Sequence, residues 1–289
     1  MLKLKTQNLR QLLKYCGIKP SKRLGQNFLV DKRVLEKIIE VASPSSKDLV
    51  LEVGPGLGML TVELARRVKK VIAIEKDKTL SQILKDILKS KGINNVEVIN
   101  KDILQISNFE FLISNKILNP NYKIVANLPY YITSPFIRKF LEAEHKPKLI
   151  VLMVQKEVAQ RICAKPPKMS LLAVAVQFYA KPEIVSYVSK KSFFPQPKVD
   201  SAILRIAPQK NADSYAEKRG ISPEQFFKIV KAGFSSRRKF LINNLSRELK
   251  IKNYKLKIVF DQIGLGQKLR AENLSIEDWL KLYYELYKT

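Results

Sequence analysis

A glycine-rich turn and a later acidic residue are spaced as in a nucleotide-binding site. Residues 50–58 read VLEVGPGLG, an apolar run that ends in an acid and continues into glycines. Glycine lets the backbone turn sharply and approach a ligand closely, because it has no Cβ. Glu75 follows Gly54 by 21 residues, near the offset at which a carboxylate accepts hydrogen bonds from a ribose diol. This combination predicts an adenosine-type cofactor, although the glycines are spaced G-x-G-x-G and not G-x-G-x-x-G.

A second candidate site is the segment NLPY at residues 127–130. The exocyclic amine of adenine is a weak nucleophile, because its lone pair is shared with the ring. The side-chain oxygen of Asn127 and the carbonyl of Leu128 can accept its two N–H bonds, and Pro129 restricts Leu128 to an extended conformation. Tyr130 offers a ring on which a base removed from its helix or loop can stack. Taken alone, the segment also fits a β-turn with an aromatic plug.

Alternating strands and helices must position these residues. The expected strands are Leu49–Val53, Val71–Glu75, Val96–Ile99, Lys123–Ala126 and Leu149–Val154, and helical patterns lie between them, over 57–68, 80–88 and 134–142. Repeated βα units predict an α/β fold with a doubly wound, mostly parallel sheet. Gly54, Glu75, Asp102 and Asn127 each lie at the carboxyl end of a strand, so we expect them at one edge, where such sheets bind ligands.

The remainder of the chain predicts a second, smaller domain. Residues 171–180 are apolar and fit a helix or a strand, and Ser201–Ile206 fits a last strand. Two capping boxes, which begin at Ser222 and Ser275, indicate helices in the tail. We therefore expect one domain over 1–208 and a small helical domain over 209–289.

The composition favours a nucleic-acid partner. The chain of 289 residues has a net charge of +27 and an ordinary hydrophobic content of 46%. Its first 23 residues contain seven basic side chains and no acidic one, which predicts a basic, partly helical arm. Such a charge favours polyanions, and RNA or DNA more than a membrane surface. A generally lysine-rich proteome is the alternative explanation.

Other classes of protein are disfavoured. Two cysteines and a single histidine, His145, show no metal-ligand spacing, so we expect no metal and a reducing compartment. The arm lacks the apolar region of a signal peptide, and the run Leu149–Val154 is too short to cross a bilayer. We expect a soluble cytoplasmic protein, with a monomer as the default state.

Several motifs together resemble the ribosomal RNA adenine N6-dimethyltransferase family, specifically its KsgA-type branch. They cover nearly the whole chain and include residues 24–29 (LGQNFL), 52–58, Glu75, Asp102, 127–131 (NLPYY), 194–201 (FPQPKVDS) and 234–241 (FSSRRKFL). The resemblance implies a Rossmann-like class I methyltransferase domain with S-adenosylmethionine as methyl donor. It also implies an RNA-binding role for the helical domain. The implied substrate is a pair of adjacent adenosines in the 3′-terminal hairpin loop of small-subunit (16S) rRNA, dimethylated at N6 during biogenesis of the 30S subunit.

The same resemblance assigns roles to individual residues. For the cofactor, Asn27 and Leu29 close over it, Gly54 contacts its methionine end, Glu75 binds the ribose and Asp102 binds the adenine amine. For the target base, Asn127 sits between donor and target, Leu128 and Tyr130 act as described above, and Phe194 stacks on the other face of the base.

Three alternatives stay open on the sequence. A resistance methyltransferase of large-subunit rRNA shares the catalytic loop, but Leu24-Gly25 and Arg237-Arg238-Lys239 resemble the small-subunit type. A non-catalytic RNA- or DNA-binding assembly factor keeps the fold, although the intact site residues speak against it. An NAD-dependent oxidoreductase fits the turn and Glu75, but the glycine spacing is wrong for it and no hydride-handling acid or base is evident.

Overall fold

The computed structural model describes residues 13, 17–21, 23–106, 122–208 and 220–287. Most of the predicted basic arm, including its helix, lies outside the described residues. None of the helices in the described ranges is long and apolar enough to cross a membrane.

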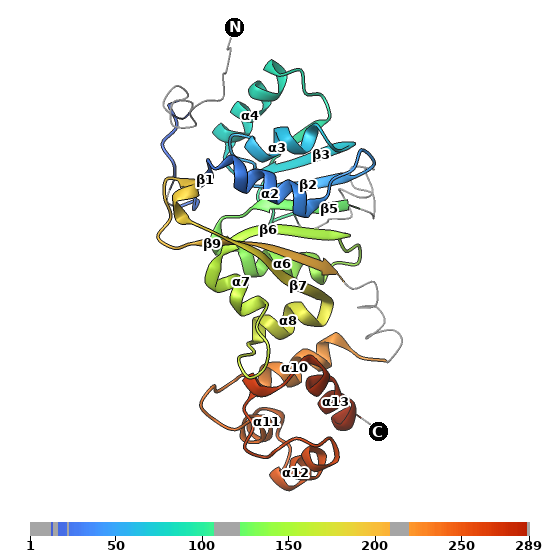
Figure 1. Ribbon diagram of the computed structural model, residues 1–289. Helices are drawn as coiled ribbons and strands as arrows, with labels where there is room; N and C mark the ends of the chain where they lie inside the picture. The colour runs from blue at the N-terminus through green and yellow to red at the C-terminus, as the bar shows by residue number, and fades with distance from the viewer. Residues whose placement is uncertain (1–12, 14–16, 22, 107–121, 209–219, 288–289) are drawn as a thin grey trace. The chain divides into compact units, whose positions relative to one another are not determined.

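The larger element of the fold is a seven-stranded sheet in the order β4-β3-β2-β5-β6-β9-β7 (Figure 1). Strands β2 to β6 are parallel to one another, and β9 pairs with β6 in the antiparallel direction. The strands are β2 (Leu49–Val53), β3 (Lys70–Glu75), β4 (Val96–Asn100), β5 (Tyr122–Asn127), β6 (Leu149–Gln155), β7 (Ala180–Val188) and β9 (Ser201–Pro208). The predicted doubly wound, mostly parallel sheet is confirmed.

Helices pack on the sheet through apolar faces. They include α2 (Lys32–Ala42), α3 (Met59–Ala65) and α4 (Lys78–Ser90). Two further helices are α6 (Thr133–Leu141), which follows β5 in the chain, and α7 (Lys156–Ile162), which follows β6. Successive residues of the central strands, such as Val50 and Leu51, are all buried, so both faces of the sheet are covered. This burial explains why the strands read as continuous apolar runs and not as alternating ones. A separate pair of short strands, β1 (Phe28–Leu29) and β8 (Phe193–Phe194), is antiparallel.

Two details differ from the sequence predictions, and one alternative that the sequence left open is decided. The helix expected over 57–68 is confined to α3, because the glycine turn continues to Gly58, whose N–H donates to Pro55 O and whose φ is +79°. Strand β7 and helix α7 were not predicted. The apolar run at 171–180 is a helix, α8 (Leu171–Tyr179), with Ser170 as its N-cap.

The division into domains also differs from the prediction. The structure forms two compact units, and the second contains residues 160–182 as well as 209–289. The reason is that α8 packs against two helices of the tail, α10 (Pro223–Gly233) and α13 (Ile276–Tyr287). The rings of Phe178 and Phe226 stack at 4.5 Å between centroids, which anchors α8 in that unit. A break at 208 alone therefore does not describe the domains.

The second unit is otherwise helical, as predicted for the tail. Its further helices are α11 (Leu241–Leu249) and α12 (Asn253–Gln262), and Trp279 of α13 lies fully buried among them. Ser222 caps α10 and precedes Pro223 at the first helical position, as the capping-box pattern indicates.

Candidate active site

A pocket lies at the carboxyl ends of the parallel strands. Gly54 follows β2, Glu75 ends β3, Asp102 follows β4 and Asn127 ends β5, and all four line this pocket. The pocket spans the position between β2 and β5 where the strand order reverses, the usual ligand site of such sheets. The structure thus brings together four residues that lie up to 73 positions apart in the sequence.

The carboxylate of Glu75 is fixed by backbone donors. Its Oε2 accepts from Gly56 N–H at 3.1 Å, and its Oε1 accepts from Asp77 N–H at 2.9 Å. Burial raises the pKa of Glu75, and these hydrogen bonds oppose the rise. A carboxylate has about four acceptor positions, so two stay available for ribose hydroxyls. Gly56 is needed here because its φ is +57° and a Cβ would press on the Phe28 ring.

Glu52 is a pocket residue to which the sequence reasoning gave no role. It is 2% exposed, and its Oε2 has no hydrogen-bond partner among the described residues; nor has the buried hydroxyl of Thr61. Burial raises the pKa of Glu52 to about 8; the neighbouring hydroxyl of Thr61 opposes the rise, and the nearby charge of Glu75 adds to it. An acid one residue before the end of an otherwise apolar strand was the signal in the sequence. Buried polar atoms of this kind fit a site that a polar, cationic ligand completes.

Asp102 lies in an ion pair that the sequence did not predict. Lys76 Nζ is 2.8 Å from Asp102 Oδ2, and Leu104 N–H donates to Asp102 Oδ1 at 3.0 Å. Partial burial works to raise the pKa of Asp102, but these hydrogen bonds outweigh it and hold the pKa below its ordinary value. The carboxylate therefore stays charged and able to accept hydrogen bonds.

Asn127 is linked to the segment of residues 24–29, which lines the pocket. Its Nδ2 donates to Asn27 O at 3.1 Å, across 100 residues of sequence. The segment 24–29 is held by a second contact, in which Gln26 Nε2 donates to Asp77 Oδ2 at 3.0 Å. Asn27 and Leu29 both line the pocket, together with Leu128, which is buried.

Tyr130 is oriented by a strand that lies 71 residues further along the chain. Its hydroxyl lies 2.7 Å from Ser201 Oγ, the first residue of β9. Ser201 is fully buried, whereas Tyr131, the residue after Tyr130, is 55% exposed. The ring of Tyr130 lines the pocket while its hydroxyl is engaged elsewhere. Sequence reasoning missed Ser201, because no local pattern connects it to Tyr130.

Phe194 differs from the other predicted site residues, because it is not among those that line the pocket. It pairs with Phe28 in the β1–β8 ribbon and packs on the apolar cluster that contains Phe28, Leu57 and Leu80. Its proposed stacking on a base remains a prediction.

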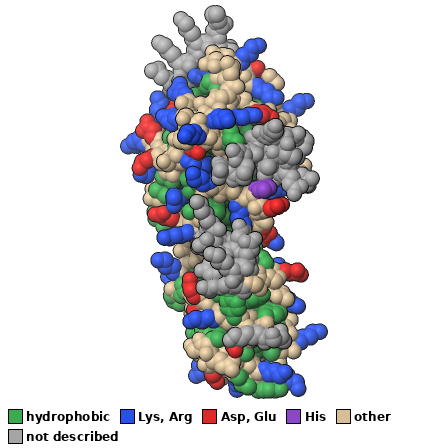
Figure 2. Space-filling view, turned by 90° about the vertical axis from the view of Figure 1, so that its right-hand side faces the viewer, with side chains coloured by type: hydrophobic (Ala, Val, Ile, Leu, Met, Phe, Trp, Pro, Cys, Tyr) green, Lys and Arg blue, Asp and Glu red, His purple; other side chains and the backbone are tan. Residues whose placement is uncertain are grey.

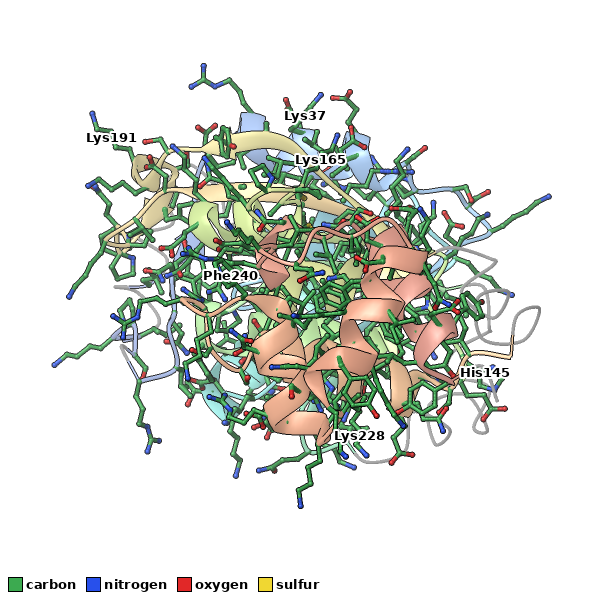
Figure 3. All side chains as sticks on the ribbon, turned by 90° about the horizontal axis from the view of Figure 1, so that it is seen from below. Lys37, His145, Lys165, Lys191, Lys228 and Phe240 are labelled. Atoms are coloured by element: carbon green, nitrogen blue, oxygen red, sulfur yellow. The ribbon has the colours of Figure 1, made fainter. Side chains whose placement is uncertain are left out.

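Basic side chains cover much of the surface. Figure 2 shows Lys and Arg spread over one face, with fewer acidic side chains among them. Lys191 in the first unit and Lys228 in the second are exposed and point away from the ribbon (Figure 3). In the second unit, Phe240 is 40% exposed and directly follows the basic triplet 237–239. Exposed cations beside an aromatic ring suit RNA docking.

Comparisons with known proteins agree with this geometry. The family model described as "Ribosomal RNA adenine dimethylase" matches residues 17–288. A protein of Dehalococcoides mccartyi named ribosomal RNA small subunit methyltransferase A is 44% identical, over 96% of this chain and 91% of its own length. A protein of the same name from Alkaliphilus oremlandii is 40% identical, over 96% of each chain.

Two solved structures are also similar over most of the chain. The dimethyladenosine transferase from Plasmodium falciparum has a TM-score of 0.75 and 30% identity, over 90% of this chain and 98% of its own. The 23S rRNA methyltransferase ErmE has a TM-score of 0.70 and 29% identity, over 90% and 99%. On the extent of the family match and the identity to these relatives, the chain belongs to the ribosomal RNA adenine dimethylase family and is an S-adenosylmethionine-dependent rRNA adenine methyltransferase.

Proposed function

We propose that this enzyme dimethylates N6 of two adjacent adenosines in the 3′-terminal hairpin loop of small-subunit rRNA, on the immature 30S subunit in the cytoplasm, as a monomer. The observation that carries the proposal is the gathering of Gly54, Glu75, Asp102 and Asn127 in one pocket. The names of the 40–44% identical relatives support the small subunit as substrate over the large one.

The residues of the pocket fit the cofactor. Glu75 keeps two acceptor positions for the ribose, and Asp102 is held charged for the adenine amine. Glu52, whose buried Oε2 has no hydrogen-bond partner among the described residues, lines the same pocket, and we assign it to the cationic part of the cofactor. Asn27 and Leu29, which line the pocket, close over the bound cofactor in this proposal, and Gly54, with a φ of +67°, lets the backbone approach the methionine end. When bound, S-adenosylmethionine supplies an electrophilic methyl carbon.

The residues on the other side of the pocket hold the nucleophile. Because Nδ2 of Asn127 is engaged by Asn27 O, the side-chain oxygen is the group that accepts from the target amine. The carbonyl of Leu128 accepts the second N–H, and Tyr130 stacks on the base. With the amine held by Asn127 and Leu128, its lone pair would face the methyl group that the bound cofactor would supply, and the proton lost from the nitrogen would leave to water. Holding the reactants in line supplies most of the acceleration.

The test is labelled methyl transfer to small subunits purified from cells that lack this modification. Mass spectrometry of the rRNA is expected to find two neighbouring N6-dimethyladenosines in the 3′ hairpin. Large subunits and naked 23S rRNA serve as controls. Preferred methylation of the large subunit would replace this proposal with the resistance-type activity. A protein without transfer activity that still restores subunit assembly would replace it with an assembly-factor role.

A further inference from the structure

The loop that carries Asp102 is held by two lysines from other elements. Lys76 Nζ lies 2.8 Å from Asp102 Oδ2, and Leu104 N–H donates to Oδ1. From the other side, Lys139 Nζ of α6 donates to Leu104 O at 3.3 Å and to Ile106 O at 2.6 Å. The carboxylate is thus tied at one oxygen to its own loop and at the other to Lys76.

The contact with Lys76 bears on what the carboxylate can bind. Lys76 and Asp102 both line the cofactor pocket, and Lys76 directly follows the proposed ribose ligand Glu75. The two existing hydrogen bonds use about half of the acceptor positions of the Asp102 carboxylate. The remaining acceptor positions of the carboxylate point in a fixed direction, because rotation of the Asp102 side chain would break its ion pair with Lys76.

We propose that Lys76 is a positioning residue for the adenine of the cofactor, whose ammonium group holds the Asp102 carboxylate charged and oriented to accept the exocyclic amine. This inference rests on the proposed role of Asp102. Lys76 touches the site through Asp102, so it sets the affinity for the adenine ring and takes no part in methyl transfer.

The charged surroundings of the pair predict how binding depends on pH. Partial burial works to raise the pKa of Asp102, and the Lys76 and Leu104 hydrogen bonds, with the charge of Lys139, lower it. The hydrogen bond to Asp102 and its charge raise the pKa of Lys76; the nearby Tyr131 adds to the rise and Arg23 opposes it. Removal of the Lys76 charge therefore raises the pKa of Asp102, and binding is lost at a higher pH on the acid side.

The experiment is titration calorimetry of the full chain with S-adenosylhomocysteine and with S-inosylhomocysteine, in which a carbonyl replaces the exocyclic amine. Lys76→Met removes the charge and keeps the length of the side chain, and Lys76→Arg keeps the charge. Lys78→Met is the matched control, because Lys78 is an exposed cation two residues along the chain that does not line the pocket. Asp102→Asn, alone and combined with Lys76→Met, completes a double-mutant cycle.

The expected result for Lys76→Met is about tenfold weaker binding of S-adenosylhomocysteine, with less discrimination against the inosine analogue. The pH below which Lys76→Met loses binding of S-adenosylhomocysteine is expected to be higher than that of the parent. Lys76→Arg is expected to rescue binding, and Lys78→Met to match the parent. In the Asp102→Asn background, Lys76→Met is expected to have no further effect. Lys76 is half exposed, so circular dichroism is expected to show folded variants.

Two results would overturn the inference while the proposed function stands. One is a Lys76→Met variant with unchanged affinity, discrimination and pH profile, although Asp102→Asn loses discrimination. The other is an equal loss from Lys76→Met with and without Asp102. If Asp102→Asn itself discriminates like the parent, the proposed role of Asp102 fails and the inference fails with it.

Discussion

Buried polar groups at the amino ends of the parallel strands are hydrogen-bonded, whereas one at the carboxyl ends lacks a partner among the described residues. At the amino ends, Lys123 Nζ donates to Ala42 O, Ser43 O and Asp48 Oδ2 at 2.7 to 3.1 Å. At the carboxyl ends, Glu52 Oε2 has no partner in the described structure. The pKa of Asp48 is lowered, because the hydrogen bonds from Lys123 and Ser45 outweigh partial burial, whereas burial raises the pKa of Glu52.

This difference separates stability from function within one sheet. Buried polar groups are normally hydrogen-bonded, and those left incomplete cost free energy. The amino end of the sheet satisfies its own groups and stabilises the fold. The carboxyl end leaves acceptors incomplete or partly used, and a ligand completes them. Loss of a satisfied group at the amino end should therefore lower the free energy of unfolding. Substitutions at the carboxyl end should impair binding and catalysis, or, where they remove an unsatisfied buried charge, raise the free energy of unfolding.

The largest effect is expected for Asn127→Ala at the carboxyl end. Loss of the amide oxygen should reduce methyl transfer by about 10³-fold, or about 4 kcal/mol in the activation free energy. Calorimetric binding of S-adenosylhomocysteine should weaken by less than about tenfold, since only the link to Asn27 is lost. Undiminished transfer would remove Asn127 from the catalytic role.

Glu52→Gln tests the incomplete end through pH. The pKa of the folded protein lies above the value of 4.5 for the unfolded chain, so the stability contributed by the protonated Glu52 is complete below pH 4.5. It is lost as the pH rises through about 8. The free energy of unfolding of Glu52→Gln, relative to the parent, should therefore increase over this range by roughly 3 kcal/mol.

Urea unfolding of the cofactor-free protein at pH 5 and pH 8 measures this change. Glu63→Gln is the control, because Glu63 lies on the surface side of α3 in ion pairs with Arg66 and Arg67. A constant difference between Glu52→Gln and the parent at both pH values would contradict the prediction.

Lys123→Met tests the satisfied end. It leaves Asp48 and two carbonyls without their buried donor, which should lower the free energy of unfolding by about 3 kcal/mol. Methyl transfer per folded molecule should stay within about threefold of the parent, because Lys123 is at the opposite end of β5 from Asn127. If Lys123→Met left the free energy of unfolding unchanged and impaired methyl transfer, the amino end would serve function and not stability, contrary to the comparison above.

The smallest effect is expected for Ser201→Ala. Loss of the contact with Tyr130 should free the ring and raise the KM for the RNA by about threefold to tenfold, with little change in kcat. Tyr130→Phe removes the same contact from the other partner and should give the same result, and the double variant should be no worse. A fall in kcat alone would indicate a chemical role for the Tyr130 hydroxyl instead.

The parallel part of the fold and the rim of the site were predictable from local pattern. Apolar runs that end in Gly54, Glu75 and Asn127 indicate buried parallel strands, and such strands align their carboxyl ends. The chemistry of these residues was readable as well, because residue type decides what an amide or a carboxylate can bind. Strand β9 was predicted over Ser201–Ile206, but its antiparallel pairing with β6 and the ribbon β1–β8 were beyond such reasoning, because these pairings join distant segments.

The sequence by itself determined which residues meet at the carboxyl edge of the sheet, because strand periodicity and βα connection are local properties. Only the tertiary structure decided which side chains hold those residues in place. These contacts join segments that lie 26 to 100 positions apart: Lys76 with Asp102, Asn27 with Asn127, and Ser201 with Tyr130. The packing of residues 160–182 with the tail is of the same kind. Contacts at such separations depend on how the elements pack, and no local pattern of residue types records that packing.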